Sequence, residues 1–485
     1  HGLVRGATLF PHNIGLGAAR DPELLQRISS AVAREVLATG YNWDFAPGVI
    51  VAQDIRWGRT YESFGERAEL QDILAGPAVT GLQNTPLDGV YMAGSAKHFL
   101  GDGGATWGTG MPTPATKVPQ IDRGDARGRL EDLIALHGQG YKHAIAAGID
   151  TVMASYSSVN GVRMHANKAL LTDYLKGGVA EGGLGFDGFV ISDWNAIDEL
   201  AVDPALEPLS RYQDQLVTAV NAGVDMIMVF GRLDFGNGRE DSEYRYTRVH
   251  QLLLAAVRDG LINESRVDDA VRRILRVKSR IGLLREEVRN QLAQPGPSSL
   301  DRHFGAPEHR AIAREAVQKS LVLLKNERGA LPIATHKYKR VCVAGSKADD
   351  FGTQAGAWTV GWQGQVGNAN KTAGANSILD GIKSAAASQG IELVYAADGL
   401  FAPHLCGEDT LILVVLGERP YAEYFGDSND LRLDSADIQL IQQVQSLRSP
   451  TVGILLSGRP LIITEQLPIF DAFVAAWLPG SQGEG

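Results

Sequence analysis

Polar and charged side chains close several apolar runs in the first half of this sequence. GFVISDW ends in Asp193 and Trp194, SAKHFL carries Lys97 and His98, TVMASY closes with Tyr156, and a further run leads through Asp54 to Arg59 in DIRWGRTYESFGE. Parallel barrels place their catalytic groups at the carboxyl ends of the strands. Carboxylate, cation and aromatic side chains on one rim suit a polyhydroxylated ligand, because hydroxyl groups need charged hydrogen-bond partners and sugar rings stack on aromatic faces.

Each of these residues also has a purely structural explanation. An aspartate after a strand can cap the next helix, which without further context explains Asp193 as well as catalysis does. Lys97 and His98 can form a structural pair, and single tryptophans are more often core residues than binding platforms; the tryptophans in question are Trp57, Trp194, Trp358 and Trp362. The function therefore depends on whether the fold brings these residues together.

The first half of the chain alternates strand-length apolar runs with amphipathic helical stretches, as repeated βα units around a parallel sheet do. The expected strands are NWDFAPGVIVA, SAKHFL, TVMASY, GFVISDW and MIMVFG. We expect a helix over 21–39, where Asp21 caps, Pro22 opens the first turn and apolar residues recur every four positions before Gly40. A second helix is expected from about Ser265 to about Gly282.

A polar, proline-bearing stretch, REEVRNQLAQPGPSSLDRHFGAP, follows this helical region and is interpreted as an interdomain linker. The predicted boundaries are 1–285 for the first domain, 286–306 for the linker and 307–485 for the second. A helix over 307–319 and the runs SLVLLKN, RVCVAGS, ELVYAA, TLILVVLG, TVGILLSG and AFVAAWLPG predict a smaller α/β layered domain.

Composition excludes several classes of partner. The 485 residues include 46 basic and 56 acidic side chains, a formal charge of -10 that repels a phosphate backbone, so nucleic acid is not an expected partner. No apolar run reaches the roughly 20 residues of a membrane helix. The two cysteines, Cys342 and Cys406, give neither a disulfide framework nor a zinc cluster, and Cys342 reads as a buried strand residue. No metal or organic cofactor is expected.

Taken together and in order, the motifs resemble glycoside hydrolase family 3, in its bacterial-like exo-β-glucanase and β-glucosidase branch. The matching strings span nearly the whole chain: ATLFPHNIGLGAARDPELL, DIRWGRTYESFGE, KHFLGDGG, SYSSVNGVRMHAN, GFVISDWNAID, AGVDMIMV, REAVQKSLVLLKN, AWTVGWQG, LGERPYAEYFGD, LSGRPL and AAWLPGSQGEG. The resemblance implies an α/β fold with a (β/α)8 TIM-like barrel followed by an αβα sandwich, and an active site at their junction.

The same resemblance implies roles for individual residues. Asp193 in SDW matches the catalytic nucleophile, and Glu423 in PYAEYFGD matches the general acid/base supplied by the second domain. Six further residues are implied to bind substrate beside the nucleophile or to stack on the next sugar: Arg59, Lys97, His98 and Tyr156 around the first sugar, and Trp194 with Trp362 around the second. A ring held between two indoles tolerates several linkages, because stacking depends on the face of the sugar.

The two carboxyl groups must differ in protonation at one pH. We expect Lys97 and Arg59 to favour the charged form of Asp193, and a less polar surrounding to keep Glu423 protonated. A retaining enzyme holds the pair about 5–5.5 Å apart, against roughly 6.5–9.5 Å in an inverting one. The expected activity is release of glucose from the nonreducing ends of β-glucan oligosaccharides or β-glucosides through a covalent intermediate.

Some positions depart from the family pattern. An aspartate that binds the first sugar should stand just before the segment with which this chain begins, and the family continues beyond AAWLPGSQGEG, so we expect a portion of a longer protein. Asn195 and Glu199 stand where plant relatives carry an acidic residue and an arginine. A periplasmic or secreted bacterial enzyme is expected, although no signal segment is visible. Preferred linkage, bound structural ions and oligomeric state are not predicted.

Three alternatives stay open at this point. A β-xylosidase would need only a changed sugar pocket around the same catalytic pair. A β-N-acetylglucosaminidase is disfavoured, because no Asp-X-His follows the KHF segment and a second domain carries Glu423. An inactive carbohydrate-binding protein is disfavoured by the joint presence of Asp193, Glu423, Lys97 and His98.

Overall fold

The computed structural model describes residues 4–87, 89–112, 117–235, 238–293, 302–327, 329–334, 337–359, 361–402, 405–407 and 410–485. The chain forms two compact units, which are described separately. One, the four-stranded unit, comprises Val36–Gln53 and Arg67–Gly296; the other, the six-stranded unit, comprises His1–Glu35, Asp54–Glu66 and Pro297–Gly485. The predicted domain boundaries at 285 and 307 stay predictions.

The four-stranded unit is built on a parallel sheet in the order β1-β2-β4-β7. Its strands are β1 (Trp43–Asp44), β2 (Ala93–Phe99), β4 (Thr151–Ala154) and β7 (Phe189–Ile191). Every residue of β4 and β7 is buried, as expected where both faces of a parallel sheet are covered. The run MIMVFG was predicted as a strand, but it contributes only a parallel bridge between Ile191 and Met226.

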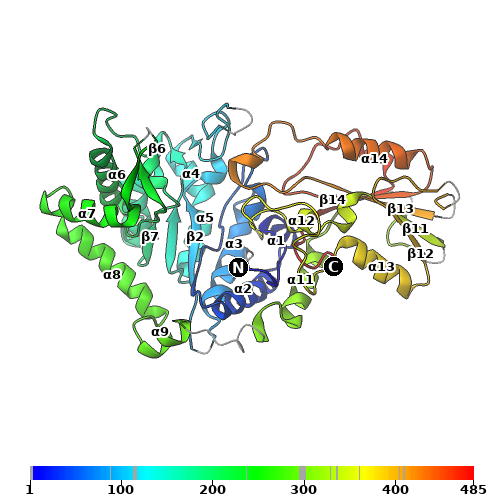
Figure 1. The fold of residues 1–485 in the computed structure, drawn as a ribbon, viewed down its shortest axis with the longest axis horizontal. Coiled ribbons are helices and arrows are strands. Elements are labelled where there is room, and N and C mark those ends of the chain that lie inside the picture. Colours follow the sequence, from blue (N-terminus) through cyan, green and yellow to red (C-terminus); the bar gives the residue numbers. More distant parts are fainter. Residues whose placement is uncertain are drawn as a thin grey trace. The chain divides into compact units, whose positions relative to one another are not determined.

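Helices alternate with these strands in sequence, as Figure 1 shows. They are α3 (Glu69–Gln83), α4 (Leu130–His137), α5 (Gln139–Ala146), α6 (Pro208–Ala222), α7 (Arg245–Arg258), α8 (Glu264–Arg280) and α9 (Glu286–Ala293), with one π-helix over Ala169–Lys176. Small sheets join β3 (Asp125–Ala126), β5 (Ser158–Val159) and β6 (Val162–Arg163), and β8 (Arg232–Asp234) with β9 (Glu240–Tyr244). The α/β organisation is confirmed, and closure into an eight-stranded barrel stays a prediction.

Local signals in the sequence account for the helix ends. The predicted helix over 21–39 is α2 (Pro22–Ala38), and Asp21 Oδ1 accepts the backbone N–H of Leu24 at 2.9 Å. The predicted helix from Ser265 is α8, whose N-cap Asn263 accepts the N–H of Ser265. Helix α9 occupies the first part of the predicted linker and was not anticipated; residues 294–301 of that linker lie outside the described residues.

The six-stranded unit contains one sheet in the order β10-β15-β14-β13-β11-β12. The strands are β10 (Val322–Asn326), β11 (Arg340–Ala344), β12 (Glu392–Ala396), β13 (Thr410–Gly417), β14 (Thr451–Leu456) and β15 (Ala472–Trp477), and all pairings are parallel except β10 with β15. Each coincides with a predicted run. The remaining helices are α1 (Asn13–Ala19), α11 (Pro307–Ser320), α12 (Phe351–Ala355), α13 (Ile378–Ser388) and α14 (Ser435–Gln445).

Helices cover both faces of this sheet. Alternate strand residues such as Val343 and Leu413 pack with Leu379 of α13, whereas Ile412 and Val414 pack in a second cluster with residues of α14. Figure 1 shows α13 and α14 on opposite sides of the strands. This is the layering expected of an αβα arrangement, and the alternation of side chains along each strand produces it.

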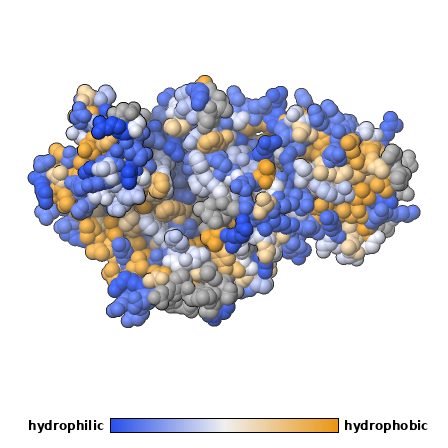
Figure 2. Space-filling model, viewed as in Figure 1, coloured by the Kyte–Doolittle hydropathy of each residue, from blue (hydrophilic) through white to orange (hydrophobic). Residues whose placement is uncertain are grey.

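Length and apolar character decide whether any of the helices in the described residues can span a membrane. None of them is long and apolar enough to cross a bilayer. Hydrophilic and hydrophobic residues are intermixed over the face shown in Figure 2. This finding agrees with the sequence, in which no apolar run approached the required length.

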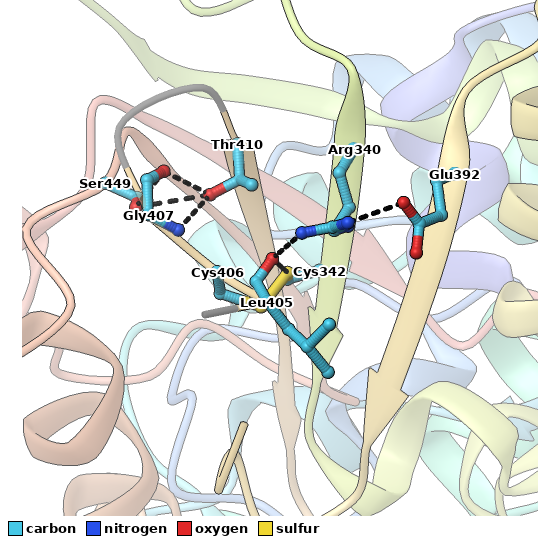
Figure 3. Close-up of a disulfide and its surroundings, with 8 residues drawn as sticks. All are labelled: Arg340, Cys342, Glu392, Leu405, Cys406, Gly407, Thr410 and Ser449. Carbon is cyan, nitrogen blue, oxygen red and sulfur yellow. Dashed lines mark hydrogen bonds and ion pairs between the residues drawn. A yellow bond between two sulfur atoms is a disulfide. The ribbon is translucent and has the colours of Figure 1, made fainter. Parts of the chain in front are cut away.

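Cys342 and Cys406 form a disulfide, which corrects the expectation that the two cysteines give no disulfide framework. Cys342 lies in the middle of β11, Cys406 precedes the neighbouring strand β13, and their Cα atoms are 6.4 Å apart. Arg340 lies beside the bridge and donates to the carbonyl of Leu405 at 2.5 Å and to Glu392 at 2.6 Å (Figure 3). A separation of 64 residues hides this pairing in the sequence, because only the sheet brings the two segments together.

We predict that this disulfide contributes substantially to the stability of the six-stranded unit. A crosslink between residues 64 apart lowers the entropy of the unfolded chain, with a stabilisation of about 4 kcal/mol in the chain-entropy description. Reduction of the wild-type protein should lower its unfolding midpoint in denaturant. The double variant Cys342→Ala/Cys406→Ala should have a low midpoint from the start, and reductant should not change it. An unchanged midpoint on reduction would contradict the prediction.

Candidate active site

Three parallel strands of the four-stranded unit end at one edge and place predicted site residues there. β2 carries Lys97 and His98 at its end, Tyr156 follows β4, and Asp193 and Trp194 follow β7. His98 Nε2 lies 3.7 Å from Asp193 Oδ2. The structure thus places His98, Asp193, Tyr156 and Trp194 at the same edge, and their catalytic and binding roles stay predictions.

His98 bridges two carboxylates. Its Nδ1 lies 2.9 Å from Oδ2 of Asp102, and Oδ1 of Asp102 accepts the backbone N–H of Gly103 at 2.9 Å. His98 and Asp102 are both buried, and Asp193 is the second acid that the ring faces. The two ring nitrogens of His98 therefore face two different carboxylates, Nδ1 toward Asp102 and Nε2 toward Asp193.

A buried histidine fixes the backbone of Asp193. Nε2 of His165 accepts the N–H of Asp193 at 3.1 Å, and the ring also bonds to the backbone of Ser155. Burial lowers the pKa of His165 to about 3, helped by the charge of Arg163, so the ring stays neutral and can accept at Nε2. The side chain of Asp193 is oriented as well, because its Oδ1 accepts the N–H of Trp194 at 2.7 Å.

Tyr156 and Arg123 lie next to the segment Asp193–Trp194 that follows β7. The hydroxyl of Tyr156 donates to the carbonyl of Trp194, and the guanidinium carbon of Arg123 lies 3.7 Å above the tyrosine ring. Arg123 also donates to Glu199 at 3.0 Å, and Arg163 lies 3.6 Å from the same carboxylate. Glu199, which departs from the plant pattern, therefore neutralises two arginines at this edge.

Lys97 lies next to His98 and is half-buried. Its backbone is bridged to Gly48, and its N–H donates to the carbonyl of Pro47 at 3.1 Å. The backbone is therefore anchored at the strand end. The predicted role of the ammonium group in binding sugar and in favouring ionised Asp193 stays a prediction.

Glu423 belongs to the six-stranded unit, where it begins the short helix Glu423–Gly426. Its backbone is left-handed, with φ of 53°, and its side chain is buried. Left-handed backbone is uncommon for a residue other than glycine and costs of order 1 kcal/mol, a feature that concentrates at functional sites. We expected a less polar surrounding for Glu423, but Arg59 Nη1 lies 4.0 Å from its carboxylate.

Arg59 is held within the same unit by Glu62. The guanidinium makes a two-pronged ion pair at 2.8 and 2.9 Å, and Glu62 also accepts from the indole of Trp358 at 3.2 Å. Arg59 is only 5% exposed, so this geometry is fixed by its surroundings. The structure places Arg59 with Glu423.

The segment Asp54–Glu66 is attached to the rest of the six-stranded unit by bonds to three residues, Tyr421, Asp427 and Arg459. Gly58 N–H donates to Asp427 at 2.8 Å and the hydroxyl of Tyr61 donates to the carbonyl of Tyr421 at 2.9 Å. Arg459 donates to the carbonyl of Arg56 at 3.1 Å. A Cβ at Gly58 would lie 2.0 Å from the carbonyl oxygen of Glu423, so glycine is required for this close approach.

Trp362 lies in an exposed aromatic group in this unit. Its ring centroid is 5.4 Å from that of Phe425 at 90°, 6.4 Å from that of Tyr424 and 6.5 Å from that of Trp358. The indole is 41% exposed, so it is not a core residue. An exposed face of this kind can stack on a sugar ring.

Comparison with known proteins identifies the family. The sequence model described as "Glycosyl hydrolase family 3 N terminal domain" matches residues 1–277, and "Glycosyl hydrolase family 3 C-terminal domain" matches residues 321–485. The chain belongs to glycosyl hydrolase family 3. The two-domain α/β architecture of this family is therefore shown, and the resemblance drawn from the motifs is confirmed.

Three family 3 relatives match nearly the whole of this chain. A lysosomal β-glucosidase of Dictyostelium discoideum is 31% identical over 99% of this chain, and a periplasmic β-glucosidase of Salmonella typhimurium is 26% identical over 98%. The crystal structure of an exo-1,3/1,4-β-glucanase from a Pseudoalteromonas species is 40% identical over 100% of this chain, with a TM-score of 0.84. This chain spans 56%, 60% and 56% of those three proteins, respectively.

Several residues of this candidate site carried no predicted role. Asp102 stands in the quoted string KHFLGDGG, four positions after His98, and its acidic character was the available signal. His165 stands in SYSSVNGVRMHAN, where a histidine gives no sign of its partner. Glu62 and Gly58 lie in DIRWGRTYESFGE, and their importance depends on contacts with distant segments.

We predict that Gly58→Ala damages the six-stranded unit. The added methyl group would meet the backbone of Glu423 and Gly426, which cannot move aside as a flexible side chain can. The thermal midpoint should fall by several degrees, in line with a loss of roughly 3 kcal/mol or more. Gly76→Ala in α3 is the matched control, because open space surrounds that position. Equal midpoints for the two variants would contradict the prediction.

We also predict that His165 makes stability depend on pH. Its folded pKa of about 3 lies below the unfolded value of 6.5, so unfolding takes up a proton between these values and stability is lost as pH falls through the window. The slope of unfolding free energy against pH is at most about 1.4 kcal/mol per unit for one such group. His165→Gln should have a flatter profile between pH 6.5 and 5, measured by denaturant unfolding. Parallel profiles for wild type and variant would refute the assignment.

Proposed function

We propose that this protein is a retaining, exo-acting β-glucosidase or exo-1,3-1,4-β-glucanase that releases glucose from the nonreducing ends of β-glucans and their oligosaccharides. Asp193 is the nucleophile and Glu423 the general acid/base. The observation that carries the proposal is the strand-end arrangement of Asp193, with its carboxylate beside His98 and its backbone bonded to His165. Similarity to the exo-1,3/1,4-β-glucanase supports the substrate class.

The proposed reaction has two steps, each of which inverts the anomeric carbon. An oxygen of Asp193 attacks that carbon as the bond to the leaving oxygen breaks, and Glu423 gives its proton to the leaving oxygen. Glu423 then takes a proton from water, the water oxygen attacks the same carbon, and the carboxylate of Asp193 is released. Two inversions leave glucose in the β configuration.

Charged neighbours suit these two roles. His98, bonded to Asp102, can stabilise an ionised Asp193, which must remain free of a proton to attack. Arg59 is available to Glu423 as a partner once Glu423 has given its proton away, while Glu62 balances part of the guanidinium charge. Lys97 and Tyr156 contribute to the pocket for the first sugar, and Trp194 and Trp362 to the stacking of the next.

The finer details of fold and location belong to the same proposal. We infer a (β/α)8 barrel around β1, β2, β4 and β7, and an αβα sandwich around the six-stranded sheet. A periplasmic or secreted location is supported by the Cys342–Cys406 disulfide, since disulfides persist in oxidising compartments, and by the periplasmic relative.

We predict a specific chemical rescue for Glu423→Ala in the full-length protein. On a β-glucoside with an activated dinitrophenyl leaving group, the variant should form the covalent intermediate but release it slowly, because no base activates water. Azide, which needs no base, should restore turnover and yield β-glucosyl azide. Asp430→Ala, which removes an exposed carboxylate, is the control and should behave as wild type. A product of α configuration, or no rescue, would contradict the assignment.

Substrate class is tested with chromogenic β-glucoside, β-xyloside and β-N-acetylglucosaminide. The proposal predicts the highest kcat/KM for the glucoside. A preference for the xyloside would move the assignment to a β-xylosidase with the same catalytic pair. No hydrolysis of any of the three would favour a carbohydrate-binding protein.

A further inference from the structure

Trp194 contacts a second exposed aromatic side chain, Phe230, that no motif singled out. The ring centroids are 5.0 Å apart and the planes are tilted by 30°. Trp194 is 51% exposed and Phe230 is 64% exposed. Scattered single aromatics on a surface need no explanation, but two exposed rings in contact, directly beside Asp193, form a continuous apolar surface that suits a ligand.

The backbone positions of the two rings are tied together. Asn195 Oδ1 accepts the N–H of Phe230 at 2.9 Å, and the N–H of Asn195 donates to the carbonyl of Met228 at 3.1 Å. Ser192 Oγ accepts the N–H of Met228 at 2.8 Å. Asn195 has a left-handed backbone, with φ of 50°, which asparagine tolerates better than most residues. The turn after β7 and the segment ending at Phe230 therefore act as one framework.

The backbone of Trp194 belongs to the same framework. The backbone of Trp194 is held on both sides, by Asp193 Oδ1 at its N–H and by the hydroxyl of Tyr156 at its carbonyl. Its side chain is half exposed, so burial alone does not select the orientation of the ring. Phe230 contacts the indole, and the half of the side chain that stays exposed can meet a sugar ring.

We propose that Phe230 is a specificity-determining residue for the sugar on the leaving-group side of the cleaved bond. It holds the indole of Trp194 in the orientation on which that sugar stacks. A ring oriented in advance loses less conformational entropy on binding. Phe230 is a positioning residue, since it acts through Trp194. This inference rests on the proposed function and adds the residue that selects sugar leaving groups over small ones.

The test compares leaving groups in the full-length protein with Phe230→Ala. The substrates are laminaribiose, whose leaving group is a glucose, and β-glucosyl fluoride, whose leaving group is too small to reach Trp194. We expect the KM for laminaribiose to rise about 2- to 10-fold, which corresponds to the loss of one aromatic pair interaction. The kcat for laminaribiose should stay nearly unchanged, and kcat/KM for the fluoride should not change. Phe230→Tyr keeps the ring contact and should restore the KM.

A second variant and a matched control separate positioning from general damage. Asn195→Gly keeps the left-handed backbone and removes the acceptor of the Phe230 N–H, so it should raise the KM for laminaribiose in the same way. Tyr41→Ala is the control. It removes a 71% exposed aromatic side chain just before β1, at the opposite ends of the strands, and should change the kinetic constants for neither substrate.

The outcomes distinguish this inference from the proposed function. Suppose that the wild-type protein cleaves both substrates. If Phe230→Ala then changes kcat/KM for neither substrate, or for both equally, the role of Phe230 alone is overturned. Wild-type protein that cleaves neither substrate overturns the proposed function and this inference with it. A selective loss on laminaribiose supports both.

Discussion

A neutral, buried imidazole holds the residue on which the proposed chemistry depends. His165 can accept the N–H of Asp193 only while it carries no proton at Nε2, and its burial ensures this over the physiological pH range. Because the backbone of Asp193 is fixed in this way, its carboxylate stands at the carboxyl edge of the parallel strands beside His98. The next residue is tied to it, because Asp193 Oδ1 accepts the N–H of Trp194 at 2.7 Å.

Glu423, the proposed acid/base, belongs to the six-stranded unit and has a left-handed backbone. Two contacts flank this left-handed backbone: Gly58 approaches the carbonyl oxygen of Glu423 closely, and Gln363 donates to the carbonyl of Ala422 at 3.2 Å. Arg59 reaches Glu423 because the segment Asp54–Glu66 folds with this unit and not with the strands that flank it in sequence. A short stretch from the first half of the chain thus sets the electrostatic surroundings of the proposed acid/base.

Features set by local pattern could be predicted from the sequence, and features set by distant contacts could not. The strands β10 to β15 and the helices α2, α8 and α11 coincide with expected runs, since buried parallel strands and amphipathic helices leave strong local signals. The disulfide, the grouping of Asp54–Glu66 and the acceptor role of His165 depend on segments far apart in sequence. The candidate site shows the same division: strand ends predicted that Asp193 and His98 lie at one edge, whereas the partners of Asp102 and Phe230 depend on contacts that the strand pattern does not show.

The central claim is that Asp193 forms the covalent bond to the sugar, and mechanism-based labelling tests it most directly. The full-length protein is incubated with 2-deoxy-2-fluoro-β-glucosyl fluoride, digested with protease, and the labelled peptide is sequenced by mass spectrometry. The account predicts time-dependent inactivation with a single fluoroglucosyl group on Asp193, and no label in Asp193→Asn. A label on any other residue of an otherwise active protein would contradict it.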